Sequence, residues 1–218
     1  MNADDVVQYL QDNPVFFEDY AEMLSQITVP NPHGGQAIAL SDRQVLTLRE
    51  KNKALETKLA ELIQFGEEND AISNKMHRLS VALLPAADLA AMLAVLFYNL
   101  REDFAVPHAT VRLWRGGAIG MEAFTPVTDD VKQYAAGLAR PYCGASGNLE
   151  IASWYGDAAA HVRSVAFMPL ADTGVGARET FGLLALGSED PLRFYPEMGT
   201  VYLARLGELV SAALGRWI

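Results

Sequence analysis

Residues 41–84 limit most strongly what this chain can fold into, because no proline interrupts them and apolar residues recur every seven positions. Val45, Asn52 and Leu59 occupy a positions of the heptad, and Leu48, Leu55 and Leu62 occupy d positions. The pattern shifts near Gly66, resumes, and stops at Pro85. A helix of about forty residues, at 1.5 Å per residue, spans roughly 60 Å, which exceeds the width of a small domain. The sequence therefore predicts one long signalling or dimerisation helix over 41–84.

The heptad pattern predicts that two copies of this helix associate in parallel. A polar Asn52 at a buried a position fixes the register and favours two strands, at some cost in stability. The alternative is that the helix packs on its own chain. We expect a homodimer, with the interface formed by Val45, Leu48, Asn52, Leu55, Leu59 and Leu62.

Residues 1–40 are predicted to form a helical docking segment followed by a hinge. Apolar residues over 3–28 are spaced for two short amphipathic helices, the second capped by Asn13. Such helices are too small to fold alone, so the face with Phe16, Phe17 and Tyr20 is expected to dock on an unidentified protein partner. The segment "NPHGG" at 31–35 is interpreted as the hinge; a phosphate loop or a metal site at this segment is less favoured.

Residues 86–218 predict an α+β domain, an antiparallel sheet with helices on its faces. A helix is expected from Leu89 to Phe104, and a strand follows in "HATVRLWR". The glycines at 116–117 predict a hairpin turn into a second strand over 118–126. A helix over 127–140, a weak strand within 147–155, two clear strands over 162–172 and 181–188, and a closing helix over 195–218 complete the domain.

Composition excludes several classes of protein. No apolar run reaches the roughly 18 residues of a membrane helix, and the N-terminus lacks the basic start of a secretory leader. Cys143 is the only cysteine, which rules out an intramolecular disulfide and favours the cytoplasm. The net charge of −10 comes without a basic stripe, so neither a membrane nor direct nucleic-acid binding is expected.

No motif indicates catalysis or a metal site. The four histidines are isolated from one another and from Cys143, so no spacing suits metal ligands. The glycines within 173–179 resemble a dinucleotide fingerprint, but strands are expected on both sides, and that fingerprint needs a strand followed by a helix. Cys143 could be a redox thiol, although a buried small residue is the favoured interpretation. We therefore expect no enzyme and no catalytic residue.

Two stretches resemble known families. The segments "SVAFMPLAD", "ETFGLLALGSEDPLRF" and "MGTVYLARLGELVSAAL" resemble the C-terminal half of a GAF domain. The segment from "VVQYLQDNPVFFEDY" to "IQFGEEND" is similar to the N-terminal signature of a bacterial GAF-like family catalogued as domain of unknown function 484. This resemblance implies a GAF-like fold after a long helix. It implies no activity, and any cofactor remains unknown.

By analogy with GAF domains, the resemblance implies a small-molecule pocket between the sheet and a layer of helices and loops. Its candidate lining residues are Arg112, Trp114, Tyr142, Cys143, Trp154 and Met168. Arg112 is the most informative, because an arginine on an apolar strand must find a partner or reach solvent. We expect a non-catalytic sensor or regulatory module that dimerises and signals through a partner. The alternatives are a structural adapter with a self-filled pocket and, least favoured, a redox enzyme using Cys143.

Overall fold

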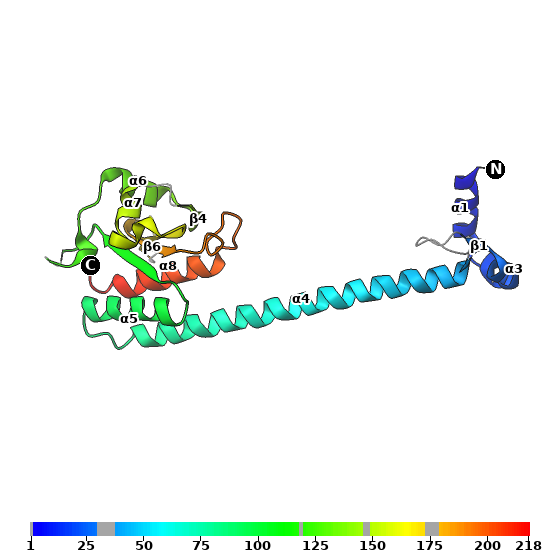
Figure 1. Ribbon diagram of the computed structural model, residues 1–218, viewed down its shortest axis with the longest axis horizontal. Coiled ribbons are helices and arrows are strands. Elements are labelled where there is room, and N and C mark those ends of the chain that lie inside the picture. The colour runs from blue at the N-terminus through cyan, green and yellow to red at the C-terminus, as the bar shows by residue number, and fades with distance from the viewer. Residues whose placement is uncertain (1, 30–37, 118–119, 146–148, 173–178) are drawn as a thin grey trace. The chain divides into compact units, whose positions relative to one another are not determined.

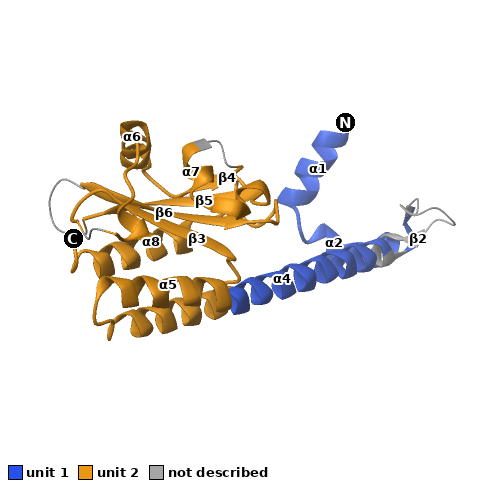
Figure 2. Ribbon diagram, turned by 60° about the vertical axis from the view of Figure 1, so that its left-hand side comes forward, with its two compact units in different colours: residues 1–68 blue, residues 69–218 orange. Residues whose placement is uncertain are grey.

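The computed structural model describes residues 2–29, 38–117, 120–145, 149–172 and 179–218. They form two compact units, residues 1–68 and residues 69–218 (Figure 2). The division falls inside the long helix rather than at its ends, so the helix contributes to both units. Each unit is described separately below.

The N-terminal unit begins with helix α1, Ala3–Asp12, whose start is closed by a capping box. The Asp5 amide donates to Asn2 Oδ1 and the Asn2 amide donates to Asp5 Oδ2, both at 2.8 Å. Two further short helices, α2 (Phe16–Asp19) and α3 (Ala21–Gln26), precede a two-residue pairing of β1 (Thr28–Val29) with β2 (Ile38–Ala39). The predicted hinge at 31–35 lies outside the described residues.

The single second helix that the sequence predicted is divided at Tyr20, whose backbone leaves the helical region. Asn13 also has a different role from the one expected. Its side-chain amide donates to the Tyr9 carbonyl at 2.9 Å, so it closes the end of α1 instead of starting the next helix. This is one of the two helix-end roles open to a short amide side chain.

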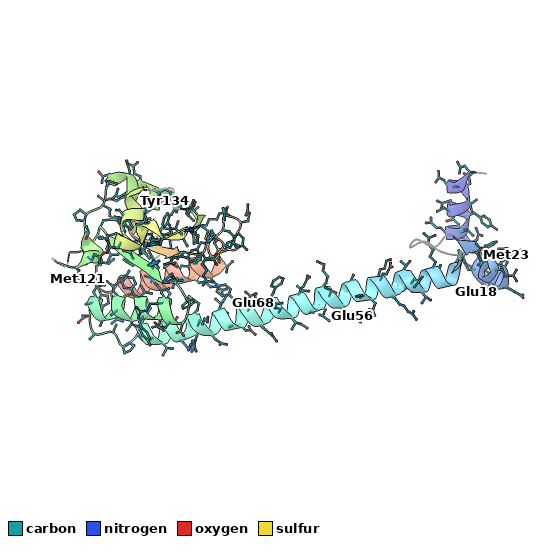
Figure 3. All side chains as sticks on the ribbon, in the orientation of Figure 1. Glu18, Met23, Glu56, Glu68, Met121 and Tyr134 are labelled. Carbon is teal, nitrogen blue, oxygen red and sulfur yellow. The ribbon has the colours of Figure 1, made fainter. Side chains whose placement is uncertain are left out.

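Helix α4 spans Leu40–Leu83, a length of 44 residues, and confirms the predicted long helix (Figure 1). It begins one residue before the expected start and ends before Pro85, as expected because proline lacks an amide proton and clashes with the preceding turn. Figure 3 shows side chains such as Glu56 and Glu68 projecting from this helix.

The second unit contains a four-stranded antiparallel sheet with strand order β3-β6-β5-β4. The strands are β3 (His108–Leu113), β4 (Tyr142–Gly144), β5 (Ser164–Ala171) and β6 (Thr180–Ser188). Helices α5 (Leu89–Glu102) and α8 (Val201–Leu214) cover one face, and α6 (Asp129–Gly137) and α7 (Leu149–Ser153) cover the other (Figure 2). Two short 3₁₀ helices, η1 (Glu122–Phe124) and η2 (Gly156–Ala160), lie between these elements. The α+β class is thus confirmed.

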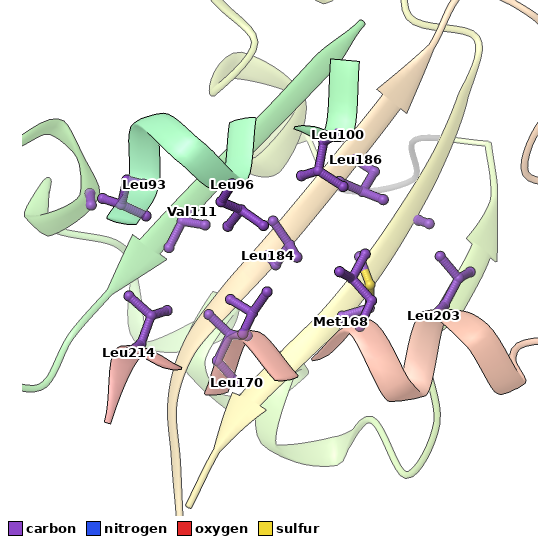
Figure 4. Close-up of a cluster of buried hydrophobic side chains, with 14 of the residues drawn as sticks. Leu93, Leu96, Leu100, Val111, Met168, Leu170, Leu184, Leu186, Leu203 and Leu214 are labelled. Carbon is purple, nitrogen blue, oxygen red and sulfur yellow. The ribbon is translucent and has the colours of Figure 1, made fainter. Parts of the chain in front are cut away.

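Alternating side chains of the central strands form two separate cores, as the two-residue period of a strand requires. Met168, Leu170, Leu184 and Leu186 face α5 and α8, where they pack with Leu96, Leu100 and Leu203 (Figure 4). Val165, Phe167, Leu183 and Ala185 face the other way and pack with Val131 and Ile151. The sheet is therefore covered on both faces.

Three expectations for this unit are wrong. The predicted hairpin strand over 118–126 contains the 3₁₀ helix η1, held by a Thr125 hydroxyl that donates to the Glu122 carbonyl at 2.8 Å. The predicted weak strand within 147–155 contains helix α7, because buried Ile151 belongs to the second core and Glu150 accepts the Thr128 amide at 3.1 Å. The closing helix begins at Val201, after a turn in which the Met198 amide donates to the Tyr195 carbonyl.

Candidate functional site

The heptad positions of α4 form an apolar stripe that is exposed to solvent in a single chain. Leu55 is 67% exposed and Leu62 is 66% exposed, unlike the core leucines of the second unit. The other apolar members, Val45, Leu48 and Leu59, are also exposed. Asn52 lies on the same stripe, and its side-chain amide donates to Glu56 of its own helix at 3.4 Å. We call the six residues Val45, Leu48, Asn52, Leu55, Leu59 and Leu62 the α4 seam.

Arg112 is the most unusual side chain of the sheet, because its charged group is buried. Only 8% of the side chain is exposed, although it lies on the edge strand β3. Its Nη1 donates to Thr110 Oγ1 at 3.0 Å and to the Val111 carbonyl at 3.1 Å. Its Nη2 donates to Glu122 Oε1 at 2.9 Å. The partner that the buried Arg112 requires is therefore the Glu122 carboxylate, which lies on η1.

An aromatic side chain completes the surroundings of the Arg112 guanidinium. The guanidinium carbon lies 5.3 Å from the ring centre of Trp154, which follows α7, at a distance suited to a cation–π interaction. Trp114 directly follows β3, and its indole N–H donates to the Thr180 carbonyl at 2.9 Å. The structure therefore places Arg112 against Trp154 and keeps Trp114 on the same side of the strand.

The end of β3 is tied to the end of β5 by a charged pair. Arg115 donates to the two carboxylate oxygens of Asp172 at 2.7 and 2.5 Å. The hydrogen bonds from Arg115 lower the pKa of the Asp172 carboxyl below its usual range. Such two-point contacts fix orientation as well as distance. This pair fixes the strand end from which Trp114 projects.

The other predicted pocket residues lie elsewhere. Tyr142 stacks on Phe167 with ring centres 5.6 Å apart, and it belongs to β4 at the opposite edge of the sheet from β3. Cys143 and Met168 belong to the core that faces α5 and α8, across the sheet from Trp154. One pocket cannot be lined by all six residues, because alternate side chains of a strand point to opposite faces. Ligand contact by Arg112, Trp114 and Trp154 stays a prediction.

Two concave regions border the Arg112–Glu122 pair. One has a volume of about 650 Å³ and is lined by residues that include Trp114, Met121, Glu122, Phe124 and Lys132. The other has a volume of about 330 Å³ and lies between the edge of β3 and α5, with Arg112, Glu122, Leu93 and Phe97 among its lining residues. Sequence reasoning missed Met121, Glu122 and Lys132. The one available signal was that Arg112 needed an acid, and Glu122 is the first acid after it along the chain.

Cys143 is buried, and its burial raises the pKa of its thiol. Because the thiolate is the reactive form, we expect slow alkylation by iodoacetamide at pH 8, at least about tenfold slower than for free cysteine. The rate should rise only at a pH above the usual titration of a thiol, and unfolding in urea should restore the ordinary rate. Mass spectrometry of timed samples measures this. Alkylation of the folded protein at the rate of free cysteine would revive the redox interpretation.

Among the described residues, no group of three or more His, Cys, Asp and Glu side chains could hold a metal ion. No described helix is long and apolar enough to cross a membrane. In the N-terminal unit, Phe16 stacks on Tyr20 with ring centres 4.7 Å apart, and Phe17 is exposed. Docking of a protein partner on these rings stays a prediction.

Comparisons with known proteins cover the whole chain. A family model described as "Protein of unknown function, DUF484" matches residues 1–218. The chain is 27% identical over 225 residues to the uncharacterized protein YigA of Salmonella typhimurium, and equally to those of Shigella flexneri and Escherichia coli, across 98% of this chain and 91% of each relative.

Two solved structures resemble part of the chain. The GAF domain from Acinetobacter phosphoenolpyruvate-protein phosphotransferase matches with a TM-score of 0.44 and 12% identity, over 66% of this chain and 93% of that domain. The A. aeolicus nlh2 GAF domain in an inactive state matches with a TM-score of 0.46 and 12% identity, over 68% and 98%.

Proposed function

Because the chain belongs to the family described as "Protein of unknown function, DUF484", a description that assigns no activity, we propose a function from its own residues. The protein is a non-catalytic regulatory module. It acts as a homodimer, in which two copies of α4 associate in parallel, and it binds a small molecule beside Arg112. The observation that carries the dimer is the exposed α4 seam.

The free energy available from burying the α4 seam supports a second copy of the chain as the partner that covers it. Burying a leucine side chain contributes roughly 1.5–3 kcal/mol, and every seam position occurs twice in a dimer. Asn52 supports a parallel arrangement, because a parallel pair places the two Asn52 side chains opposite each other, where their amides can hydrogen-bond. An antiparallel pair would place each Asn52 against a d-position leucine and leave its amide without that partner.

The charges beside the seam also support the parallel arrangement. Lys51 occupies a g position, and Glu56 occupies the e position of the next heptad. In a parallel two-stranded coiled coil, these two positions lie beside each other across the interface, so two symmetric Lys51–Glu56 pairs would form. Each pair would be solvent-exposed and worth less than about 1 kcal/mol. The pairs therefore select orientation more than they add stability.

The experiment that tests the dimer uses cysteines placed on and off the seam. In a Cys143→Ser background, Leu59→Cys puts one thiol at an a position of the seam and leaves Asn52 in place, and Thr57→Cys puts one on the outer, f-position face. We expect oxidation of dilute Leu59→Cys protein to give a disulfide-linked species of twice the 23.7 kDa chain, while Thr57→Cys stays uncrosslinked. Sedimentation of the unmodified protein gives the mass independently.

Two outcomes would contradict this proposal. Protein that sediments as a monomer at micromolar concentration would remove the dimer altogether. A dimer in which Leu59→Cys does not crosslink would exclude the parallel arrangement, because only that arrangement aligns equivalent a positions. Native mass spectrometry of the same unmodified protein would also reveal a retained small molecule as added mass.

A further inference from the structure

The Arg112–Glu122 pair is strongly asymmetric in its exposure to solvent. The Arg112 side chain is 8% exposed, whereas the Glu122 side chain is 77% exposed. A buried guanidinium without a negative partner is costly, so some carboxylate or phosphate must lie against it. A glutamate whose side chain is already mostly in water has little buried contact to give up when it moves away. The positive partner is therefore fixed and the negative partner is replaceable.

Arg112 keeps its position without help from Glu122. Thr110 and the Val111 carbonyl accept from Nη1, and the Trp154 ring lies against the guanidinium. These three contacts come from β3 itself and from the segment after α7. Glu122, in contrast, belongs to a 3₁₀ helix of only three residues. Nη2 is thus held ready for a carboxylate whether or not that carboxylate comes from Glu122.

The space around the pair fits a compact apolar group attached to such a carboxylate. Leu93, Phe97, Met121 and Ala123 line the 330 Å³ region beside Arg112 and Glu122. On the other side of Glu122, Trp114 and Phe124 line the 650 Å³ region. Ligand sites commonly combine such apolar walls with one charged group that sets orientation.

We propose that Arg112 is the anchor of a binding site for small carboxylates and that Glu122 is its built-in occupant. A ligand carboxylate would replace the Glu122 carboxylate on Arg112 Nη2, and its apolar part would enter the space lined by Phe97 and Met121. Release of Glu122 would then remove its hydrogen bond to β3, while buried Ala123 keeps η1 packed against the core. This inference rests on the proposed small-molecule binding and is independent of the dimer.

A built-in occupant weakens ligand binding by a predictable amount. The apparent dissociation constant equals the intrinsic value divided by the fraction of molecules in which Arg112 is free. If Glu122 occupies Arg112 in about nine molecules of ten, its removal should tighten binding about tenfold. A residue that merely belonged to the wall of the site would give no tightening when it is changed.

The test is a titration with sodium benzoate at constant ionic strength, followed by isothermal calorimetry. Glu122→Gln keeps the shape of the side chain and removes the competing charge, and we expect benzoate to bind it about tenfold more tightly than it binds the unmodified protein. Glu197→Gln makes the same chemical change at an exposed position outside the site, and its affinity should equal that of the unmodified protein. Arg112→Lys should weaken binding at least about fivefold, because a lysine ammonium lacks the guanidinium geometry that lets one nitrogen donate to Thr110 while another is held toward the carboxylate.

Affinity for benzoate that is unchanged or lower in Glu122→Gln would overturn the proposal, with thermal melting used to check that the variant is folded. Benzamide is the neutral analogue of benzoate. Its binding distinguishes failure of the carboxylate proposal from failure of the proposed small-molecule binding. Binding of benzamide but not benzoate would keep a small-molecule pocket and reject the carboxylate. Binding of neither compound to either protein would reject both.

Discussion

Replacing Leu55 by aspartate is expected to convert the proposed dimer into monomers. Leu55 lies at the middle d position of the seam and is 67% exposed in a single chain, so its surface is available to a second copy. The substitution removes two leucines from the interface, worth roughly 3–6 kcal/mol together, and places two like charges opposite each other. A change of that size raises the dimer dissociation constant at least about a hundredfold.

Sedimentation velocity over a concentration series measures this change directly. Ala60→Asp is the matched control, because it introduces the same charge at a b position of the same helix, away from the seam. The control should stay dimeric at concentrations where Leu55→Asp is monomeric. If Leu55→Asp and the unmodified protein sedimented alike as dimers, the interface would have to lie on a different surface.

The second large effect is expected for Gly182→Ala in β6. A Cβ at this position would lie 2.8 Å from the Arg112 carbonyl oxygen and 2.7 Å from Leu113 Cδ2. The leucine tip could move, but the carbonyl belongs to the backbone of β3, so the neighbouring strand itself would have to shift. Overpacking of this kind typically costs about 1–3 kcal/mol, and we expect a loss near the upper end, about 3 kcal/mol.

Urea denaturation monitored by circular dichroism checks this loss. Gly199→Ala is the control, since a Cβ there would meet nothing within 4 Å, and its stability should change by less than about 0.5 kcal/mol. Because Gly182 pairs with Leu113 and its added Cβ would press on the Arg112 carbonyl, the alanine should also weaken benzoate binding in a Glu122→Gln background. Equal stability of the two alanine variants would show that β3 can move away at little cost.

The elements that were predictable from the sequence carry long, uniform patterns. The absence of proline and the heptad repeat were enough for α4, and continuous apolar runs were enough for β5 and β6. The short elements were not predictable in this way. Residues 118–126 contain an alternating pattern, yet η1 is positioned by the packing of buried Ala123 on the core and by the contact of Glu122 with Arg112, and both involve other elements.

The candidate site was predictable only in part, for a related reason. The sequence indicated that Arg112 would need a partner, but not which acid it would meet. The sequence also could not show which side chains of different strands share a face of the sheet, because that depends on how the strands are aligned with one another. Cys143 and Met168 were therefore grouped with Trp154 although the sheet separates them. Residue type suggested the chemistry, and the register of the strands decided which side chains could share a site.

Strand β6 lies between β3 and β5 and is covered on both faces, with eight of its nine residues buried. Its backbone amides have partners on both edges and no direct path to water. Amides in such a position exchange their hydrogens for deuterium only when the whole domain opens, whereas helices without buried residues, such as α1, open locally. The free energy that governs the slowest-exchanging amides of β6 is therefore the global stability of the second unit, and those amides report it without any denaturant.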